Sequence, residues 1–471
     1  MSTRRVLKSD PSVEQGKATK NWMLPQMHIY QNANRIASMV RAYTGRNRPG
    51  ISRIGVVIVV IVILVVAGGV GYFYLVPPPA TKGSTLKIGM TLSQSGIFAS
   101  LDGNYTHFND AWQSYVNSNG GLVDGSGVHH NVTIISYDDQ SQHDLAVSQY
   151  HRLAEQDNVS FLISPYSADI GKDLIPVAQR DKVPLIMAEA SSAGMWVPSN
   201  PHDWAVTSMV PYWQVNFTTG WSGSYFSMMK QQITANPNGS PKTIAFVGWD
   251  ITWANDDFNS SLNLAPQAGL SVVYQKLLQP DFTDPVAGFQ AIIPGLKTAN
   301  PDIVYLATFG PVAALWMKAA SQSGFQPKQW HTIEWGAAFA SITGQPLASH
   351  TTTEVFWTPT FASQQGSGFA DEALFNQLVA KAGVTWYNFQ NIELRMIIFE
   401  MIAKAVSQVS TPTRANLNTA LHQLNMPTVG GQLVVQPQGY GTIGLVPVQW
   451  QNGRIQTLFP QSLKNATYVY P

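Results

Sequence analysis

Two pairs of adjacent residues carry the side chains best suited to chemistry, Asp138-Asp139 and His129-His130. Paired carboxylates could act as general acid and base, and histidines could ligate a metal. Neighbouring residues at a strand end point to opposite sides, so the two aspartates do not converge on one substrate atom. The histidines follow a glycine-rich turn without further ligands at matched spacing, which favours a solvated loop over a metal site.

The familiar catalytic signatures are absent. The sequence has no G-x-S-x-G elbow, no H-E-x-x-H, no phosphate-binding loop and no cysteine. We therefore expect a binding protein rather than an enzyme, with no catalytic residue, no metal and no cofactor. Without cysteine there is also no disulfide and no lipid anchor on an N-terminal cysteine, so the fold must rest on its hydrophobic core.

The elements that would position a site begin at Leu86, where short apolar strands alternate with helical segments. A first series predicts strands at 86–92, 131–137, 159–164 and 184–188, with helices near 103–118, 143–156 and 168–180. A second series predicts strands at 242–248, 270–275, 302–307 and 331–335, with helices near 212–233, 255–266, 285–298 and 311–323. This alternation predicts an α/β protein with two doubly wound parallel-sheet lobes.

The last third of the chain predicts more helix than strand. Helices are expected near 370–382, 388–409 and 413–423, followed by strands around 430–435 and 443–450. These two strands could complete both sheets.

Residues Ile54 to Val76 predict a transmembrane helix. They include no charged side chain, and a helix of this length reaches about 34 Å, enough for the ~30 Å hydrocarbon layer. A buried core segment is the alternative, but such segments are usually shorter and interrupted by polar residues. Small residues at Ala67, Gly68, Gly69 and Gly71 could pack against another helix, although glycine is common in membrane helices.

The basic residues orient this helix. Residues 1–53 hold ten Lys or Arg and two acids, and such basic segments stay in the cytoplasm. The rest of the chain has 18 Lys or Arg and 25 acids, a formal charge of −7, which argues against nucleic acid as a partner. We expect a cytoplasmic tail or cleaved leader at 1–53, a helix at 54–76, a proline-rich linker at 77–84 and an extracellular C-terminal domain.

Sequons for N-glycosylation are confined to the predicted outer side. They fit a glycosylated surface protein and lie at Asn104, Asn131, Asn158, Asn216, Asn238, Asn259 and Asn465.

Four passages resemble the type I periplasmic binding proteins, specifically the branched-chain and other amino-acid binding proteins of ABC importers. They are LKIGMTLSQSGIFAS (86–100), NVTIISYDDQSQHDLAV (131–147), DKVPLIMAEASS (181–192) and LKTANPDIVYLATFG (296–310). The resemblance covers nearly all of 86–455. It implies two lobes joined by three crossovers, near 205–210, 350–355 and 427–431, that close on a ligand. Lobe 1 would combine 84–207 with 354–429, and lobe 2 would combine 208–353 with 430–471. It also implies that Asp138-Asp139 has a structural use.

The resemblance also implies a set of ligand-binding positions. Hydroxyls and backbone N–H groups at Tyr166, Ser167, Ala190, Ser191 and Ser192 would hold the carboxylate of an amino-acid-like ligand. An acid at the end of a lobe 2 strand, Glu334, would meet its ammonium. Aromatic walls would come from Trp253 and Phe309, with Phe98 of the opening loop as a further candidate.

Simpler interpretations of these residues stay open. Ser167 and Ser191 could cap the helices that follow them, Glu334 could be a solvated loop acid, and Trp253 and Phe309 could be lobe core. No role is transferred to Trp386, Tyr387 or Phe389, where the register against the family is ambiguous.

The string RNRPG, followed by ISRIG and the apolar run, resembles archaeal class III, pilin-like signal peptides. Cleavage would then fall between Gly50 and Ile51 and would leave the hydrophobic helix in place as an anchor. An uncleaved signal anchor is the alternative, and a start at Met27 or Met39 would give a leader of more usual length.

The function expected from these features is that of a surface-anchored solute-binding protein. It would bind a small amino-acid-like ligand between its lobes and deliver it to ABC permease subunits, with its N-terminal helix in the membrane. A ligand-sensing receptor ectodomain and a pilin-like structural surface protein are the alternatives.

Overall fold

The computed structural model describes residues 81–471, with gaps at 103–104, 167, 189–191, 193–194, 197–201, 212–221, 334–338, 365–371 and 385–391. Residues Ala80–Pro471 form a compact unit of their own. The predicted helix at 54–76 and the predicted cleavage position at Gly50 and Ile51 lie outside the described residues. Within the described part, no helix combines the length and apolarity needed to cross a bilayer.

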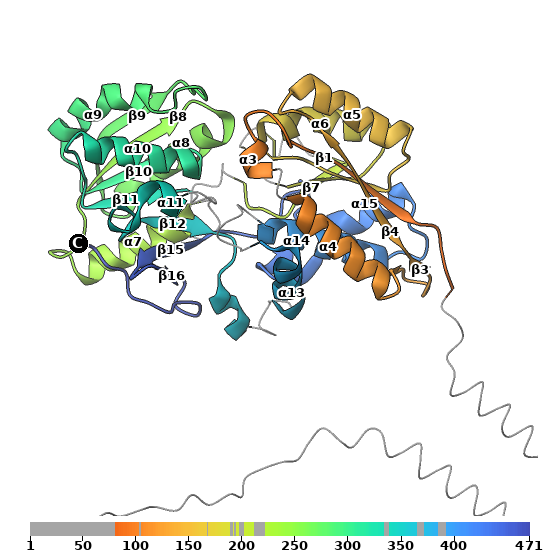
Figure 1. The fold of residues 1–471 in the computed structure, drawn as a ribbon. Coiled ribbons are helices and arrows are strands. Elements are labelled where there is room, and N and C mark those ends of the chain that lie inside the picture. Colours follow the sequence, from red (N-terminus) through yellow and green to blue (C-terminus); the bar gives the residue numbers. More distant parts are fainter. Residues whose placement is uncertain are drawn as a thin grey trace, which may run out of the picture. The chain divides into compact units, whose positions relative to one another are not determined.

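The first sheet has five parallel strands in the order β4-β1-β5-β6-β7 (Figure 1). The strands are β1 (Leu86–Leu92), β4 (Val132–Asp138), β5 (Phe161–Ile163), β6 (Leu185–Met187) and β7 (Ala205–Thr207). Helices α5 (His143–Glu155) and α6 (Ala168–Asp181) pack together on one face, and α4 (Tyr105–Ser118), which follows the short α3 (Ala99–Asp102), contacts the other. The central strands β5 and β6 are apolar throughout, and β1 is apolar except for Lys87 and Thr91, because helices cover both faces. We call this sheet with its helices lobe 1.

The second sheet has seven strands in the order β16-β15-β12-β11-β10-β8-β9. Its parallel part comprises β8 (Thr243–Trp249), β9 (Ser271–Leu278), β10 (Ile303–Ala307), β11 (Gln329–Thr332) and β12 (Thr352–Val355). Helices α7 (Gly223–Ala235) and α8 (Thr252–Gln267) contact each other, as do α9 (Ala287–Ala299) and α10 (Gly310–Gln322), with the short α11 (Phe339–Thr343) and α12 (Gln345–Ala348) after β11. We call this assembly lobe 2. Its parallel strands repeat the 2-1-3-4-5 order of lobe 1 (Figure 1).

The last third of the chain is shared between the lobes. After the 3-10 helix η1 (Pro359–Gln364), helices α13 (Glu372–Ala382) and α14 (Ile392–Ser407) contact α4 of lobe 1, and α15 (Arg414–His422) contacts α14. Strands β15 (Val446–Gln451) and β16 (Arg454–Thr457) extend the lobe 2 sheet as antiparallel strands.

The prediction that the strand at 430–435 could complete a lobe sheet is wrong. Strand β14 (Gly431–Val434) pairs only with β13 (Asn425–Thr428), in a separate two-stranded sheet. The edge beyond β7 is already occupied, because the Thr207 N–H donates to the Gly439 carbonyl at 2.8 Å and the Ile443 N–H to the Ser208 carbonyl at 3.0 Å.

The prediction of a solvated loop at His129-His130 is also wrong. These residues form β3, which pairs with β2 (Leu122–Val123). The His130 side chain is buried between the Asp124 carboxylate at 3.1 Å and the Ser84 carbonyl at 2.8 Å. The Gly83 N–H donates to the His129 carbonyl at 2.8 Å, so the end of the predicted linker packs on this strand. A side chain at Gly83 would collide with the His130 ring.

Candidate ligand-binding site

Both sheets reverse their strand order at one place, between β1 and β5 in lobe 1 and between β8 and β10 in lobe 2. In such sheets, loops at the carboxyl ends of these strands separate and leave a crevice. Residues 93–98 follow β1, and residues 164–166 follow β5. In lobe 2, Asp250 follows β8, and Thr308 and Phe309 follow β10.

The aspartate pair at the end of β4 holds the loop that follows β1. The Asp139 carboxylate accepts from the Thr91 hydroxyl at 2.5 Å and from the Ser93 hydroxyl at 2.6 Å. The Asp138 carboxylate accepts from the Ser95 hydroxyl at 2.7 Å. Burial opposes its ionisation, but donors led by the Ser95 hydroxyl outweigh burial and lower the pKa of Asp138. The pair is therefore a structural clamp on the loop.

The buried carboxyl of Asp102 and the Ser141 hydroxyl also hold this loop. Asp102 accepts from the Ser93 N–H at 2.7 Å, and Ser141 accepts from the Phe98 N–H at 3.0 Å. Burial raises the pKa of Asp102 to about 7, although the Arg395 guanidinium opposes this rise. These contacts give Phe98 a defined position at the end of the lobe 1 sheet.

Four aromatic residues singled out in the sequence meet across the two lobes. Phe98 and Tyr166 of lobe 1 have ring centroids 6.0 Å apart, and each lies about as far from Phe309 of lobe 2, at 6.1 Å and 6.0 Å. Trp253 of lobe 2 lies 5.4 Å from Phe309. All four side chains are at least 95% buried. Phe309 thus lies at the boundary between the lobes, and Trp253 contacts it from within lobe 2.

Two further aromatic residues belong to this cluster and were missed in the sequence. Trp249, the last residue of β8, lies 5.0 Å from Phe282 and 6.0 Å from Phe309. Phe282 also lies 6.3 Å from Phe98 and is 40% exposed. The position of Trp249 at a strand end could have identified it. Phe282 lies in a loop and has no such signal. We call these six residues the ring cluster.

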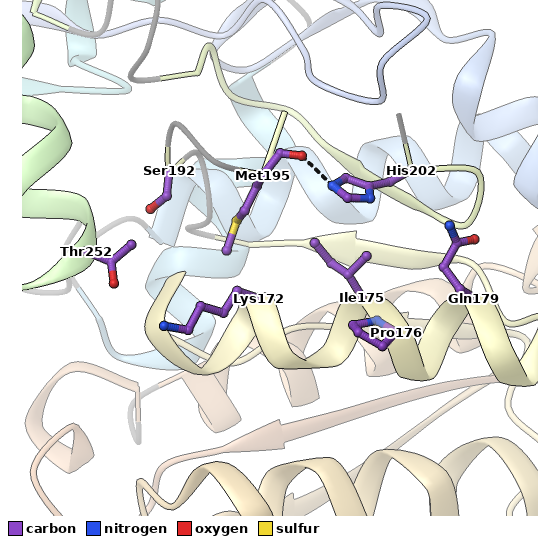
Figure 2. A pocket seen from close by; sticks show the side chains of 8 residues that line it. All are labelled: Lys172, Ile175, Pro176, Gln179, Ser192, Met195, His202 and Thr252. Atoms are coloured by element: carbon purple, nitrogen blue, oxygen red, sulfur yellow. Dashed lines mark hydrogen bonds between the residues drawn. The ribbon is translucent and has the colours of Figure 1, made fainter. Parts of the chain in front are cut away.

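A cavity of about 450 Å³ lies between helix α6 and the chain that follows β6 (Figure 2). Its lining comes mostly from lobe 1, with one contribution from the start of α8 in lobe 2. The residues are Lys172, Ile175, Pro176, Gln179, Ser192, Met195, His202 and Thr252. The volume is within the range of small-molecule sites.

Ser192 is the predicted ligand-binding residue that lines this cavity. It is 2% exposed, and its hydroxyl oxygen has no hydrogen-bond partner among the described residues. A buried hydroxyl without a partner costs stability unless a ligand or water satisfies it. Ser192 is therefore available to a polar ligand atom.

The remaining predicted ligand-binding residues, Ser167, Ala190, Ser191 and Glu334, lie outside the described residues. Their roles stay predictions, and so do the alternative interpretations of Ser167, Ser191 and Glu334.

Among the described residues, one cluster has the composition of a metal site, formed by His151, Glu155 and Asp181. The Arg180 guanidinium lies among these groups, at 2.8 Å from Glu155 and at 2.5 Å from Asp181, and it also contacts the His151 ring. Because a cation already neutralises the acids, the cluster needs no metal ion.

The described sequon asparagines are accessible. Asn131, Asn158, Asn238, Asn259 and Asn465 are all exposed. Exposure permits glycosylation, which stays a prediction for these five and for Asn104 and Asn216, both outside the described residues.

A family model described as periplasmic binding protein matches residues 85–453. The chain belongs to the periplasmic binding protein family. The matched residues contain the first sheet, every strand of the second sheet except β16, and the ring cluster. This family consists of binding proteins rather than enzymes.

Solved structures share the fold at low sequence identity. An ABC transporter substrate-binding protein from Aeropyrum pernix has a TM-score of 0.64 at 17% identity, over 80% of this chain and 95% of that one. A possible leucine/isoleucine/valine-binding protein from Rhodopirellula baltica has a TM-score of 0.62 at 18% identity, over 82% and 98%. A branched-chain amino acid transporter substrate-binding protein from Streptococcus pneumoniae, in complex with isoleucine, has a TM-score of 0.61 at 15% identity, over 80% and 100%.

Proposed function

We propose that this protein is the extracellular, membrane-anchored solute-binding protein of an ABC importer, and that it binds a small amino-acid-like ligand between its two lobes. The observation that carries the proposal is the meeting of Phe98 and Tyr166 with Phe309, which joins the carboxyl ends of both sheets. The family match and the amino-acid and transporter proteins among the similar structures agree with it.

We propose lobes close to the sequence boundaries, with 84–207 and 356–429 in lobe 1 and 208–355 and 430–471 in lobe 2. The predicted boundary at 354 moves because Glu354 and Val355 belong to β12 of the lobe 2 sheet. Three crossovers would join them. Three separate connections restrict relative motion of the lobes to a hinge, which suits closure around a ligand. The ligand favours closure only to the extent that it binds the closed form better than the open form.

The proposed site uses different residues for the carboxylate and for the ammonium of the ligand. Tyr166, Ser167, Ala190, Ser191 and Ser192 would hold the ligand carboxylate through hydroxyls and backbone N–H groups. The free Ser192 hydroxyl supports this part of the assignment.

On the other side of the ligand, Glu334 would pair with the ammonium. Phe98, Trp253 and Phe309 would form apolar walls, an arrangement supported by their shared ring contacts.

The proposed anchor is the helix at 54–76, retained after cleavage between Gly50 and Ile51. Its support is the sequence alone: an uncharged apolar run behind a basic segment. N-terminal sequencing of the membrane-extracted protein tests the cleavage. A first residue of Ile51 supports it, and an intact N-terminus upstream of Arg46 contradicts it.

Calorimetric titration of the full chain in mild detergent with amino acids, amides and small organic acids tests the binding function. We expect at least one α-amino acid to bind, and the Glu334→Gln variant to bind it at least about tenfold more weakly, because a buried ammonium loses its counter-charge. Glu155→Gln is the matched control, since Glu155 pairs with Arg180 on the surface of lobe 1. Unchanged binding by the Glu334 variant would remove the ammonium assignment. Failure of every amino acid to bind would remove the proposed ligand class.

A further inference from the structure

The end of the predicted linker, residues 81–84, lies along strand β3. The His129 N–H donates to the Thr81 carbonyl at 2.8 Å, and the Gly83 N–H donates to the His129 carbonyl at 2.8 Å. Lys82 and His129 pair as a parallel bridge. The linker residues precede the family match at 85–453. The β2-β3 hairpin therefore holds a segment that lies outside the matched region.

The His130 side chain adds a second kind of contact to this docking. Its Nδ1 lies 2.8 Å from the Ser84 carbonyl oxygen, and its Nε2 lies 3.1 Å from Oδ2 of Asp124. Both His130 and Asp124 are buried. Because a carbonyl oxygen can only accept, Nδ1 of His130 carries a hydrogen.

The other partner of the ring, Asp124, is an ionised carboxylate. Its Oδ1 accepts from the Ser126 N–H at 2.9 Å, the Ser126 hydroxyl at 2.7 Å and the Val128 N–H at 3.0 Å. Burial opposes its ionisation, but donors led by the Ser126 hydroxyl outweigh burial and lower the pKa of Asp124. Nε2 of His130 therefore carries a hydrogen too, and the ring is an imidazolium ion with one proton for each partner.

The charged groups next to the ring on the linker and on β3 point elsewhere. Lys82 is exposed. The His129 ring bonds through Nδ1 to the Gly120 carbonyl at 3.0 Å. Asp124 is thus the charged partner of His130 among these neighbours.

The helices beside the hairpin bring charged groups as well. Helix α4 precedes β2 and carries the exposed Asp110, and α14 packs on β2 and carries Glu400 and Lys404. Glu400 accepts from the Val429 N–H at 3.1 Å. Among the described residues, none of these three forms an ion pair or a hydrogen bond with the hairpin.

Loss of one proton from His130 must break one of its two contacts, because a neutral imidazole has a single N–H. Histidine side chains lose their charge between about pH 5 and pH 8. The remaining proton stays on Nε2, since a bond to a carboxylate is stronger than a bond to a carbonyl. The lone pair on Nδ1 then faces the Ser84 carbonyl oxygen and repels it. The linker, rather than the Asp124 turn, loses its contact.

The Asp124 turn has a separate attachment to the domain. The Gly125 N–H donates to the Val409 carbonyl at 2.8 Å, just beyond α14. The turn and His130 can therefore stay in place while residues 81–84 detach.

We propose that His130 is a proton-dependent clasp, which docks linker residues 81–84 on lobe 1 at low pH and loosens them as the pH rises. The clasp determines how much of the linker between the proposed anchor and the binding domain is fixed to the domain. None of its contacts involves the ring cluster, so it stands or falls separately from the proposed ligand binding.

Hydrogen exchange of the full chain in mild detergent tests the clasp. Each exchange rate is compared with the intrinsic rate at the same pH, which gives a protection factor. We expect the protection of the Gly83 N–H to fall by about tenfold between pH 5 and pH 8.5, since one charge-assisted contact is lost. The amides of β5 show in the same experiment whether each variant is folded.

Two variants should remove this pH dependence for different reasons. In His130→Gln the side chain does not titrate in this range. In Asp124→Asn a neutral His130 can donate from Nδ1 to Ser84 and accept at Nε2 from the new amide, so protection should stay high at both pH values. His143→Gln is the matched control, because His143 bonds to Asp173 at 2.6 Å on an exposed helix surface, and this variant should keep the parent's fall.

A further variant provides the released state for comparison. A Cβ added at Gly83 would lie 2.3 Å from the His130 ring, so Gly83→Ala should have low protection at residue 83 at both pH values.

Each other outcome contradicts the clasp. Equal protection of the parent at pH 5 and pH 8.5 overturns it. A fall that persists in His130→Gln, or that disappears in His143→Gln, assigns the pH dependence to another group. A fall in Asp124→Asn as large as in the parent overturns the assignment of His130 as an imidazolium ion held by Asp124.

Discussion

The two lobes share one strand order but place their acids differently. In lobe 1, Asp138 and Asp139 lie at the carboxyl edge of the sheet and clamp the loop that carries Phe98. In lobe 2, Asp257 of α8 and Glu354 of β12 lie in the interior, and their hydrogen bonds go to residues outside the ring cluster.

The lobe 2 acids are held by neutral hydroxyls. Asp257 accepts from Ser222 at 2.8 Å and from Tyr305 at 3.0 Å, and Glu354 accepts from Ser224 at 3.2 Å. Burial raises the pKa of Asp257 to about 7 and that of Glu354 to about 8. Lobe 1 also has a buried acid of this kind, because burial raises the pKa of Asp102 to about 7. The lobes therefore differ in the Asp138-Asp139 pair, which holds the loop after β1 in lobe 1.

The largest effect is expected at the centre of the ring cluster. Phe309→Ala removes a buried phenyl ring that contacts both lobes, and such changes cost about 3–5 kcal/mol of unfolding free energy. Chemical denaturation measures this loss, and titration should show weaker ligand binding as well. Phe289→Ala is the control, because Phe289 is equally buried but stacks on Trp316 within lobe 2. Equal losses of ligand affinity in both variants would deny the ring cluster a role in binding.

The next effect is the pH dependence of stability that buried Asp257 causes. Below about pH 4 both folded and unfolded chains keep the Asp257 proton, so the fold is most stable there with respect to this group. As the pH rises toward about 7 the unfolded chain alone ionises, and stability falls by up to about 4 kcal/mol. Asp257→Asn should flatten this decline in denaturation curves between pH 5 and pH 8. A decline as steep as that of the parent would assign it to other buried acids, such as Asp102.

A smaller loss of stability is expected in lobe 1, together with an effect on binding. Asp139→Asn weakens the contacts to Thr91 and Ser93 and should cost about 2–3 kcal/mol, since hydrogen bonds to a charged group are worth more than neutral ones. Because the loop carries Phe98, ligand affinity should fall too. For Asp257→Asn, in contrast, affinity at low pH should stay unchanged, and a drop there would break the distinction between the lobes.

The smallest effect is expected at Ser192. Ser192→Ala removes a hydroxyl that has no partner among the described residues, so the melting temperature should change little. Ligand affinity should fall by about 1 kcal/mol, the usual value of one hydrogen bond. A clear loss of stability with unchanged affinity would instead indicate a structural hydroxyl.

Much of the fold was predictable because its signal is local. The mostly apolar run LKIGMTL predicts β1, and IVYLA predicts β10, since strands covered by helices on both faces are largely apolar. The partners of 430–435 were not predictable in the same way, because the pairing of a strand depends on which sheet edge is free.

The residues of the candidate site also differ in whether a local sequence signal marks them. Phe98, Tyr166, Trp253 and Phe309 were found through their places after strands, where the resemblance to the family is strongest. Phe282 was missed, since it lies in an irregular loop.

The sequence by itself determined the alternation of strands and helices, the uncharged run at 54–76 behind a basic segment, and the acidic balance of the rest of the chain. Only the tertiary structure decided that Phe98 meets Phe309, more than two hundred positions away, and that the Lys172 face of α6 borders a cavity with Ser192. The physical reason is the distance along the sequence between the contacting residues. Periodicity is set by neighbours a few residues apart, whereas these contacts depend on how distant parts of the chain pack together.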